Sequence, residues 1–114
     1  MEERPFAATA SPGLLSVSGS VDEYAVIALR NALREQTDEY TASLAIDLSD
    51  ADYLPSVAVS VLVSAMRATE QNGAELALVA AQGTIAQRVL MVCALPYRDS
   101  VEVETTPPDA PVIA

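Results

Sequence analysis

Apolar and polar residues follow two different periods along this chain, and these periods predict strands and helices in turn. Short apolar or alternating runs, bounded by Pro, Gly or acidic residues, are typical of strands. Longer segments in which apolar residues recur at every third or fourth position are typical of helices that pack on a sheet. The pattern predicts strands over 6–9, 14–18, 44–46, 76–79 and 101–103, and helices over 21–35, 56–71 and 85–95.

The order of these elements predicts the fold class. Strands separated by helices need crossover connections, and such connections build a mainly parallel sheet. Pro12 and Gly13 form a natural turn between the first two strands, so we expect an antiparallel hairpin at the N-terminal edge. The result is a single α/β domain over residues 1–104, with a sheet of four to five strands packed by helices. Residues 105–114 hold three prolines and no core pattern, so we expect a flexible tail there.

The helix over 56–71 has a narrow polar face. Its polar residues follow one another in steps of three or four and therefore form one stripe along the helix. The stripe consists of Ser56, Ser60, Ser64, Arg67 and Gln71. We expect Leu62 and Met66 to be buried, and we expect Ser60, Ser64 and Arg67 to be exposed as part of a binding face. Gly73 follows the helix, as is usual just past a helix C-terminus.

Two helix starts have the spacing of a capping box, in which Ser or Thr precedes Glu or Gln by three positions. The pairs are Ser20 with Glu23 and Thr84 with Gln87, and Asp22 is an alternative N-cap for the first helix. The apolar stripes that follow predict which residues face the core. The predicted core positions are Val26, Ile27, Leu29 and Leu33 in the first helix and Ile85, Val89, Leu90, Val92 and Cys93 in the last.

Composition and charge narrow the range of partners. The 114 residues include six Arg, no Lys and sixteen acidic residues, for a net charge of −10. Such a surface repels phosphate backbones and anionic lipid headgroups, so we expect neither nucleic-acid nor membrane binding. An acidic surface suits a basic protein partner, although simple solubility explains the same charge. No apolar run reaches the roughly 18 residues of a membrane span, and residues 1–20 lack the features of a signal peptide, so we expect a cytoplasmic protein.

The residue types present leave little room for catalysis. There is no His, so an imidazole metal site or a His-based triad cannot form, and the single Cys93 allows no intramolecular disulfide. No Gly-rich phosphate loop is present, and no cofactor is expected. Asp47, Asp50 and Asp52 form the one dense set of carboxylates. They could serve acid–base chemistry in a small enzyme, but a solvated loop explains them too, and no nucleophile–base pair accompanies them.

The stretch from the strand at 44–46 into the helix at 56–71 resembles the STAS domain of anti-sigma factor antagonists. In members of that family a strand ends in Asp-Leu-Ser, an apolar pair follows, and Asp-Ser-Ser-Gly-Leu or Asp-Ser-Thr-Gly-Leu begins a helix. Asp47-Leu48-Ser49 matches the first part and Tyr53-Leu54 the apolar pair. Ser56 falls on the serine that family members phosphorylate.

The motif around Ser56 departs from the family pattern. Pro55 stands where the family has Asp, and the next three positions are Val57, Ala58 and Val59. Pro55 removes a carboxylate and an N–H beside the acceptor, and Ala58 adds a methyl group where the family has Gly. Ser56 also has an alternative role as a helix N-cap.

A second part of the resemblance lies earlier in the chain. Family members have the sequence Gly-Glu-Leu-Asp before the first helix, and that Asp lies near the phosphorylated serine. Gly19 and Asp22 match the Gly and the Asp of this motif. Over residues 5–103 as a whole, most positions match in pattern only.

The resemblance implies a binding module that acts by partner switching. The unmodified domain would bind an anti-sigma factor that is also a serine kinase, phosphorylation of Ser56 would release it, and a serine phosphatase would reset the switch. The expected partner-binding residues are Asp22, Pro55, Val57, Ala58, Ser60 and Ser64. An alternative is a STAS scaffold without phosphorylation, in a sensory complex or beside a transporter ATPase. The edge strand leaves room for a monomer or a weak homodimer.

Overall fold

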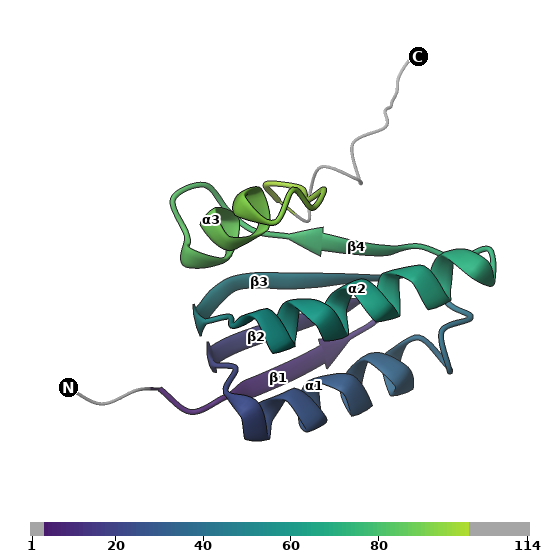
Figure 1. The fold of residues 1–114 in the computed structure, drawn as a ribbon. Coiled ribbons are helices and arrows are strands. Elements are labelled where there is room, and N and C mark those ends of the chain that lie inside the picture. Colours follow the sequence, from purple (N-terminus) through teal and green to yellow (C-terminus); the bar gives the residue numbers. More distant parts are fainter. Residues whose placement is uncertain (1–3, 101–114) are drawn as a thin grey trace, which may run out of the picture.

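The computed structural model describes residues 4–100, and within them the chain forms one mixed sheet with three helices (Figure 1). The elements are β1 (Ala7–Ser11), β2 (Leu14–Ser20), α1 (Glu23–Gln36), β3 (Leu44–Tyr53), α2 (Ser56–Gln71), β4 (Leu76–Val79) and α3 (Ile85–Val92). The strand order is β1-β2-β3-β4; β1 pairs antiparallel with β2, and the other two pairings are parallel. The predicted fold class is confirmed, with four strands in the described part of the chain.

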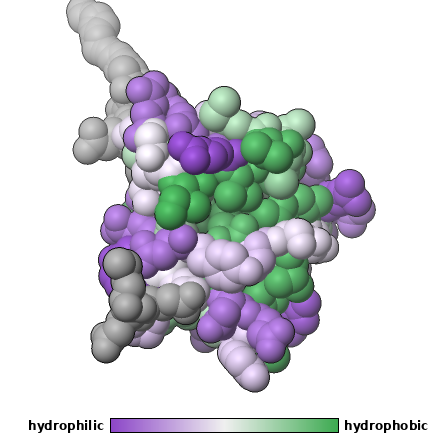
Figure 2. Space-filling view, turned by 60° about the vertical axis from the view of Figure 1, so that its left-hand side comes forward, coloured by the Kyte–Doolittle hydropathy of each residue, from purple (hydrophilic) through white to green (hydrophobic). Residues whose placement is uncertain are grey.

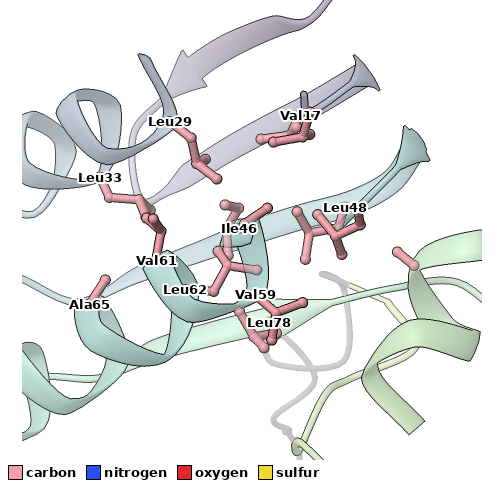
Figure 3. Packing of buried hydrophobic residues seen from close by; sticks show 14 of the residues in the cluster. Val17, Leu29, Leu33, Ile46, Leu48, Val59, Val61, Leu62, Ala65 and Leu78 are labelled. Atoms are coloured by element: carbon pink, nitrogen blue, oxygen red, sulfur yellow. The ribbon is translucent and has the colours of Figure 1, made fainter. Parts of the chain in front are cut away.

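The core lies between the sheet and the pair α1 and α2, which run side by side over one face of it (Figure 1). Figure 3 shows Leu29 and Leu33 of α1, Leu62 of α2 and Ile46 of β3 pointing into the space between the two helices and the sheet. All four side chains are fully buried. Burial of a Leu or Ile side chain contributes about 1.5–3 kcal/mol. These leucines therefore fix both helices to the sheet.

Helix α2 begins and ends where the periodicity predicts. Leu62 is buried, whereas Ser60, Ser64 and Arg67 are exposed along one face, as expected. Met66 is half-buried at the margin of the core instead of inside it. The helix ends at Asn72 and Gly73, and Gly73 has a φ of 81°. Strand β4 also has its predicted bounds.

Strand β3 is longer than predicted, and the expected acidic loop over 47–52 is strand. Its first half is central, because it pairs with both β2 and β4. Its second half pairs with β2 alone, through Ser18 with Asp50 and Ser20 with Tyr53. Beyond the end of β4 the Ser49 hydroxyl accepts the Ala81 N–H at 2.9 Å. Because the second half of β3 has no strand of the described chain paired on its β4 side, it tolerates polar residues.

The first helix starts later than the capping box predicts. Asp22 is the N-cap of α1, and its Oδ1 accepts the N–H groups of Tyr24 and Ala25 at 3.1 and 2.9 Å. Ser20 remains in β2, so the prediction that it caps the helix is wrong and the alternative is confirmed. Ile27 lies beside the buried stripe of α1 and is 61% exposed, while the other predicted core residues of α1 are buried.

In α3 the helix start is confirmed, but the buried face is wrong by one residue. Thr84 accepts the Gln87 N–H, and Gln87 accepts the Gly83 N–H in return. The core positions are Ala86 and Leu90. Ile85, Val92 and Cys93 are exposed, and Val89 is partly buried. A helix of eight residues fits two phases almost equally well, which explains the error. The helix ends at Val92 with Cys93 as the C-cap, three residues earlier than the predicted end at residue 95.

Residues 4 and 5 are held against the ends of β2 and β3. The Arg4 guanidinium donates to both carboxylate oxygens of Asp52 at 2.8 Å and to the Asp50 carbonyl at 2.7 Å. These hydrogen bonds lower the pKa of the Asp52 carboxyl and raise the pKa of Arg4. The Arg4 carbonyl accepts the Ser20 N–H at 3.0 Å. The N-terminal segment thus covers the point where β2 leads into α1.

The last part of the domain remains partly outside the described residues. Arg98 forms an isolated parallel bridge with Val79: the Arg98 N–H donates to the Leu78 carbonyl, and the Arg98 carbonyl accepts the Ala80 N–H, both at 2.9 Å. The predicted strand over 101–103, the domain end at residue 104 and the tail over 105–114 lie beyond residue 100. Among residues 4–100, no helix has the length and apolar character needed to cross a membrane.

Candidate protein-binding site at the start of α2

Ser56 is the first residue of α2, and this helix starts at the end of the molecule where the parallel strands β2, β3 and β4 have their carboxyl ends (Figure 1). Buried Leu54 anchors the short connection from β3, and Pro55 is the N-cap with extended backbone angles. The Pro55 carbonyl accepts the N–H groups of Ala58 and Val59 at 2.9 and 3.1 Å. No side chain caps the helix, so the expected role of Ser56 as N-cap is wrong. Its exposed hydroxyl is therefore available for other contacts.

Two shallow depressions meet beside Ser56 and share Val57. The first lies over the starts of α1 and α2, and the second follows the groove between these helices. The first is lined by Asp22, Glu23, Tyr24, Tyr53, Pro55 and Val57, and the second by Arg30, Tyr40, Val57, Ser60, Val61 and Ser64. Five of the predicted partner-binding residues thus lie in one continuous region around Ser56. We call this region the α1–α2 face.

The prediction that Ala58 binds a partner is wrong. Its side chain is fully buried under α2, so it cannot contact a partner directly. It belongs to the core cluster with Leu54 and Leu62. The methyl group at this position therefore fills the space between helix and sheet.

Sequence reasoning missed the aromatic residues of the α1–α2 face. Tyr24 is 79% exposed and Tyr53 is 51% exposed. A Tyr in the first turn of a helix and a Tyr at a strand end give no periodic signal of a shared surface. In Figure 2 the largest hydrophobic patch lies higher, at the level of α3, so the α1–α2 face is distinguished by Tyr24, Tyr53 and the 48% exposed Val57. Large exposed aromatic and aliphatic side chains of this kind are enriched in protein interfaces.

The charges of the α1–α2 face are few. Asp22 and Glu23 lie at one border, Arg30 lies in the groove, and the first turn of α2 has no acidic residue. Such a surface fits an apolar protein partner with basic groups toward Asp22 and Glu23. The N-terminus of a helix also carries partial positive charge, which here surrounds the Ser56 hydroxyl.

The carboxylates of β3 do not form a shared site. Asp52 is paired with Arg4, and Asp47 accepts the Ser49 N–H at 3.0 Å. Within the described ranges, no group of three or more Asp, Glu, Cys or His side chains could hold a metal ion. The side chains of Asp47 and Asp52 thus have local structural roles, and Asp50 contributes its backbone carbonyl to Arg4.

Asp22 serves both the fold and the face, and two substitutions separate these roles. Asp22→Ala removes the N-cap and should lower the free energy of unfolding by about 1 kcal/mol. That corresponds to a melting temperature lower by about 4–8 °C in a domain of this size. Asp22→Asn keeps the cap and removes one charge, so it should melt like the wild type while binding a basic partner less well. Equal melting of Asp22→Ala and wild type would contradict the cap.

The geometry defines a small α/β domain with an exposed serine at a helix start. The profile of the STAS domain matches residues 6–109, and the chain belongs to the STAS family. Among curated proteins, none matches the sequence.

Solved structures with the same fold include an anti-sigma factor antagonist from Mycobacterium paratuberculosis. It is 20% identical over 89% of this chain and 90% of its own, with a TM-score of 0.67. The anti-sigma factor antagonist SpoIIAA in its unphosphorylated form is 18% identical over 89% and 92%, with a TM-score of 0.66. The phosphorylated form of SpoIIAA, a Bacillus cell fate determinant, matches at 18% identity over 89% and 96%, with a TM-score of 0.62. At these identities the likeness shows the fold.

Proposed function

We propose that this chain is an anti-sigma factor antagonist that acts by partner switching in the cytoplasm. Its α1–α2 face binds an anti-sigma factor with serine-kinase activity, and phosphorylation of Ser56 ends the complex. A serine phosphatase restores the binding form. The chain carries out no reaction of its own. The observation that supports the proposal most is an exposed, uncapped Ser56 beside the exposed side chains of Tyr24, Tyr53 and Val57.

The position of Ser56 favours release of the partner over refolding of the domain. A phosphoserine carries about −1.5 to −2 charges. At the start of α2 the helix dipole stabilises such a charge by about 0.3–1 kcal/mol, and no acidic residue of the first turn opposes it. In a closed interface the same charge loses its water without gaining a counterion, at about 3–5 kcal/mol. The cost of burying the phosphate in the interface is larger than its stabilisation by the helix dipole. Phosphorylation should therefore dissociate the partner while the domain keeps its fold.

A second function has its own support in Pro55. Where a family acceptor follows an Asp, Ser56 follows a proline that has no N–H and no carboxylate. Asp22, one of the two acids on the face, uses Oδ1 to cap α1. A kinase that recognises the usual acidic neighbour would find none here. The alternative is therefore a STAS scaffold that binds through the same face without phosphorylation, in a sensory complex or beside a transporter ATPase.

Capture of partners from a native extract distinguishes the two functions. The wild-type chain serves as bait, with Ser56→Glu and Gln71→Glu as matched baits that add the same charge at opposite ends of α2. Recovery of a serine-kinase ATPase by wild type and Gln71→Glu, but not by Ser56→Glu, is expected for the antagonist. Recovery of a sensory or transporter subunit by all three baits would contradict it and support the scaffold.

A further inference from the structure

Strand β1 is an open edge of the sheet. It pairs with β2 and with no other strand of the described chain, and all five of its residues are exposed (Figure 1). In an antiparallel ladder, alternate residues turn their N–H and C=O groups away from the paired strand. The outer side of β1 therefore presents backbone donors and acceptors to any strand that approaches it.

The usual protections of an open edge are missing from β1. Edge strands are commonly guarded by charged side chains, by an internal proline or by a bulge. The residues Ala7–Ser11 carry no charge, Pro5 and Pro12 lie outside the strand, and the register with β2 runs from Ala7 to Ser11 without a shift. Between Arg4 and Asp22 the chain has no charged residue at all.

The core also stops short of β1 on the helix side. Val17 and Leu15 of β2 are each 1% exposed beneath the helices. Their cross-strand neighbours Ala8 and Ala10 point to the same side of the sheet, yet both are exposed. The helices thus cover this face of the sheet at β2 but not at β1. The same face of β1 is exposed to solvent.

We propose that β1 pairs antiparallel with β1 of a second copy of this chain, across a two-fold axis at Thr9. Ala8 of each copy then faces Ala10 of the other, and the two sheets join into one. The charge distribution favours a second copy. Each chain carries a net charge of −10, and most contacts between copies would bring carboxylates together. The neutral edge allows two copies to meet without such a contact.

The contact is small, so the dimer is weak. Two five-residue strands bury far less than the about 1,200 Å² below which interfaces are usually transient, so we expect a dissociation constant on the order of 0.1 mM. The α1–α2 face, at the starts of the helices, is formed without β1 and stays accessible in each copy. The dimer would thus present two binding sites to an oligomeric partner.

Sedimentation equilibrium on the purified chain tests the pairing through two charge variants of Thr9. On the axis the two Thr9 side chains are direct cross-strand neighbours, so Thr9→Glu and Thr9→Lys each place like charges opposite one another. Each variant alone should dimerise at least about fivefold more weakly than wild type. An equimolar mixture of the two places opposite charges on the axis and should recover dimerisation. Gln71→Glu is the control for a change of net charge, and it should dimerise as wild type.

Three results would overturn the proposal. A wild-type chain that stays monomeric at about 1 mM excludes the dimer. Unchanged association of Thr9→Glu and Thr9→Lys assigns any dimer to another surface. Failure of the mixture to recover association, with both variants folded by circular dichroism, excludes Thr9 at the axis.

Discussion

Ser56→Glu is expected to weaken binding of the kinase partner by about two to three orders of magnitude. The substitution places a permanent carboxylate at the centre of the α1–α2 face, where a bound partner would remove its water. The domain itself should not suffer, because Ser56 makes no capping bond and the first turn of α2 contains no acid. The helix dipole should stabilise the new charge by about 0.3–1 kcal/mol. Isothermal titration calorimetry against the captured partner measures the effect.

Two control variants make this result specific. Ser56→Ala removes the hydroxyl without adding charge, and it should bind as wild type and melt no lower, since Ala is the better helix former. Gln71→Glu adds the same charge at the far, exposed end of α2 and should leave affinity unchanged. If Ser56→Glu keeps wild-type affinity while both controls behave as described, Ser56 lies outside the interface.

Gly19→Ala should have the largest effect on stability. Gly19 has a φ of 82°, and a Cβ there would lie 2.0 Å from the Pro5 carbonyl oxygen. Left-handed backbone costs an alanine about 1–2 kcal/mol. Displacement of residues 4 and 5 also breaks the hydrogen bond from the Ser20 N–H to Arg4, worth about 0.5–1.5 kcal/mol. A loss of about 2–3 kcal/mol in the free energy of unfolding follows, measured by urea denaturation.

Gly73→Ala is the matched control for this prediction. Gly73 has nearly the same φ, 81°, but no atom within 4 Å of the added Cβ. It should show the backbone cost alone, about 1–2 kcal/mol. Hydrogen exchange of the Ser20 amide should accelerate in Gly19→Ala and not in Gly73→Ala. Equal losses of stability with a protected Ser20 amide would show that the N-terminal segment does not depend on Gly19.

The sequence predicts long amphipathic elements and their order well, and it predicts local choices poorly. The stripe of α2 spans more than four turns, so its phase and both ends follow from the pattern. In α3 eight residues leave the phase open, and Cys93 was misplaced into the core. The acids of β3 look like a loop because the apolar run ends at Ile46, whereas the strand continues past the end of β4 by pairing with β2 alone.

The candidate site was also predicted only in part from the sequence. The register of Ser56 follows from the family motif, and the exposure of Ser60 and Ser64 follows from helical spacing. That Tyr24 and Tyr53 join them depends on the parallel register of β2 and β3, which brings distant residues to one end of the sheet. Helical spacing also indicates the burial of Ala58, which lies four positions before Leu62, whereas the resemblance to the family motif assigned it to the binding site.

The location of phosphate after reaction with the captured partner and ATP is the most direct test of the switch. Mass spectrometry of the product should find one phosphate, on Ser56, and the modified chain should no longer bind the partner while its circular dichroism spectrum stays unchanged. Phosphate on another residue, no phosphate at all, or a Ser56-phosphorylated chain that still binds with wild-type affinity would contradict the account.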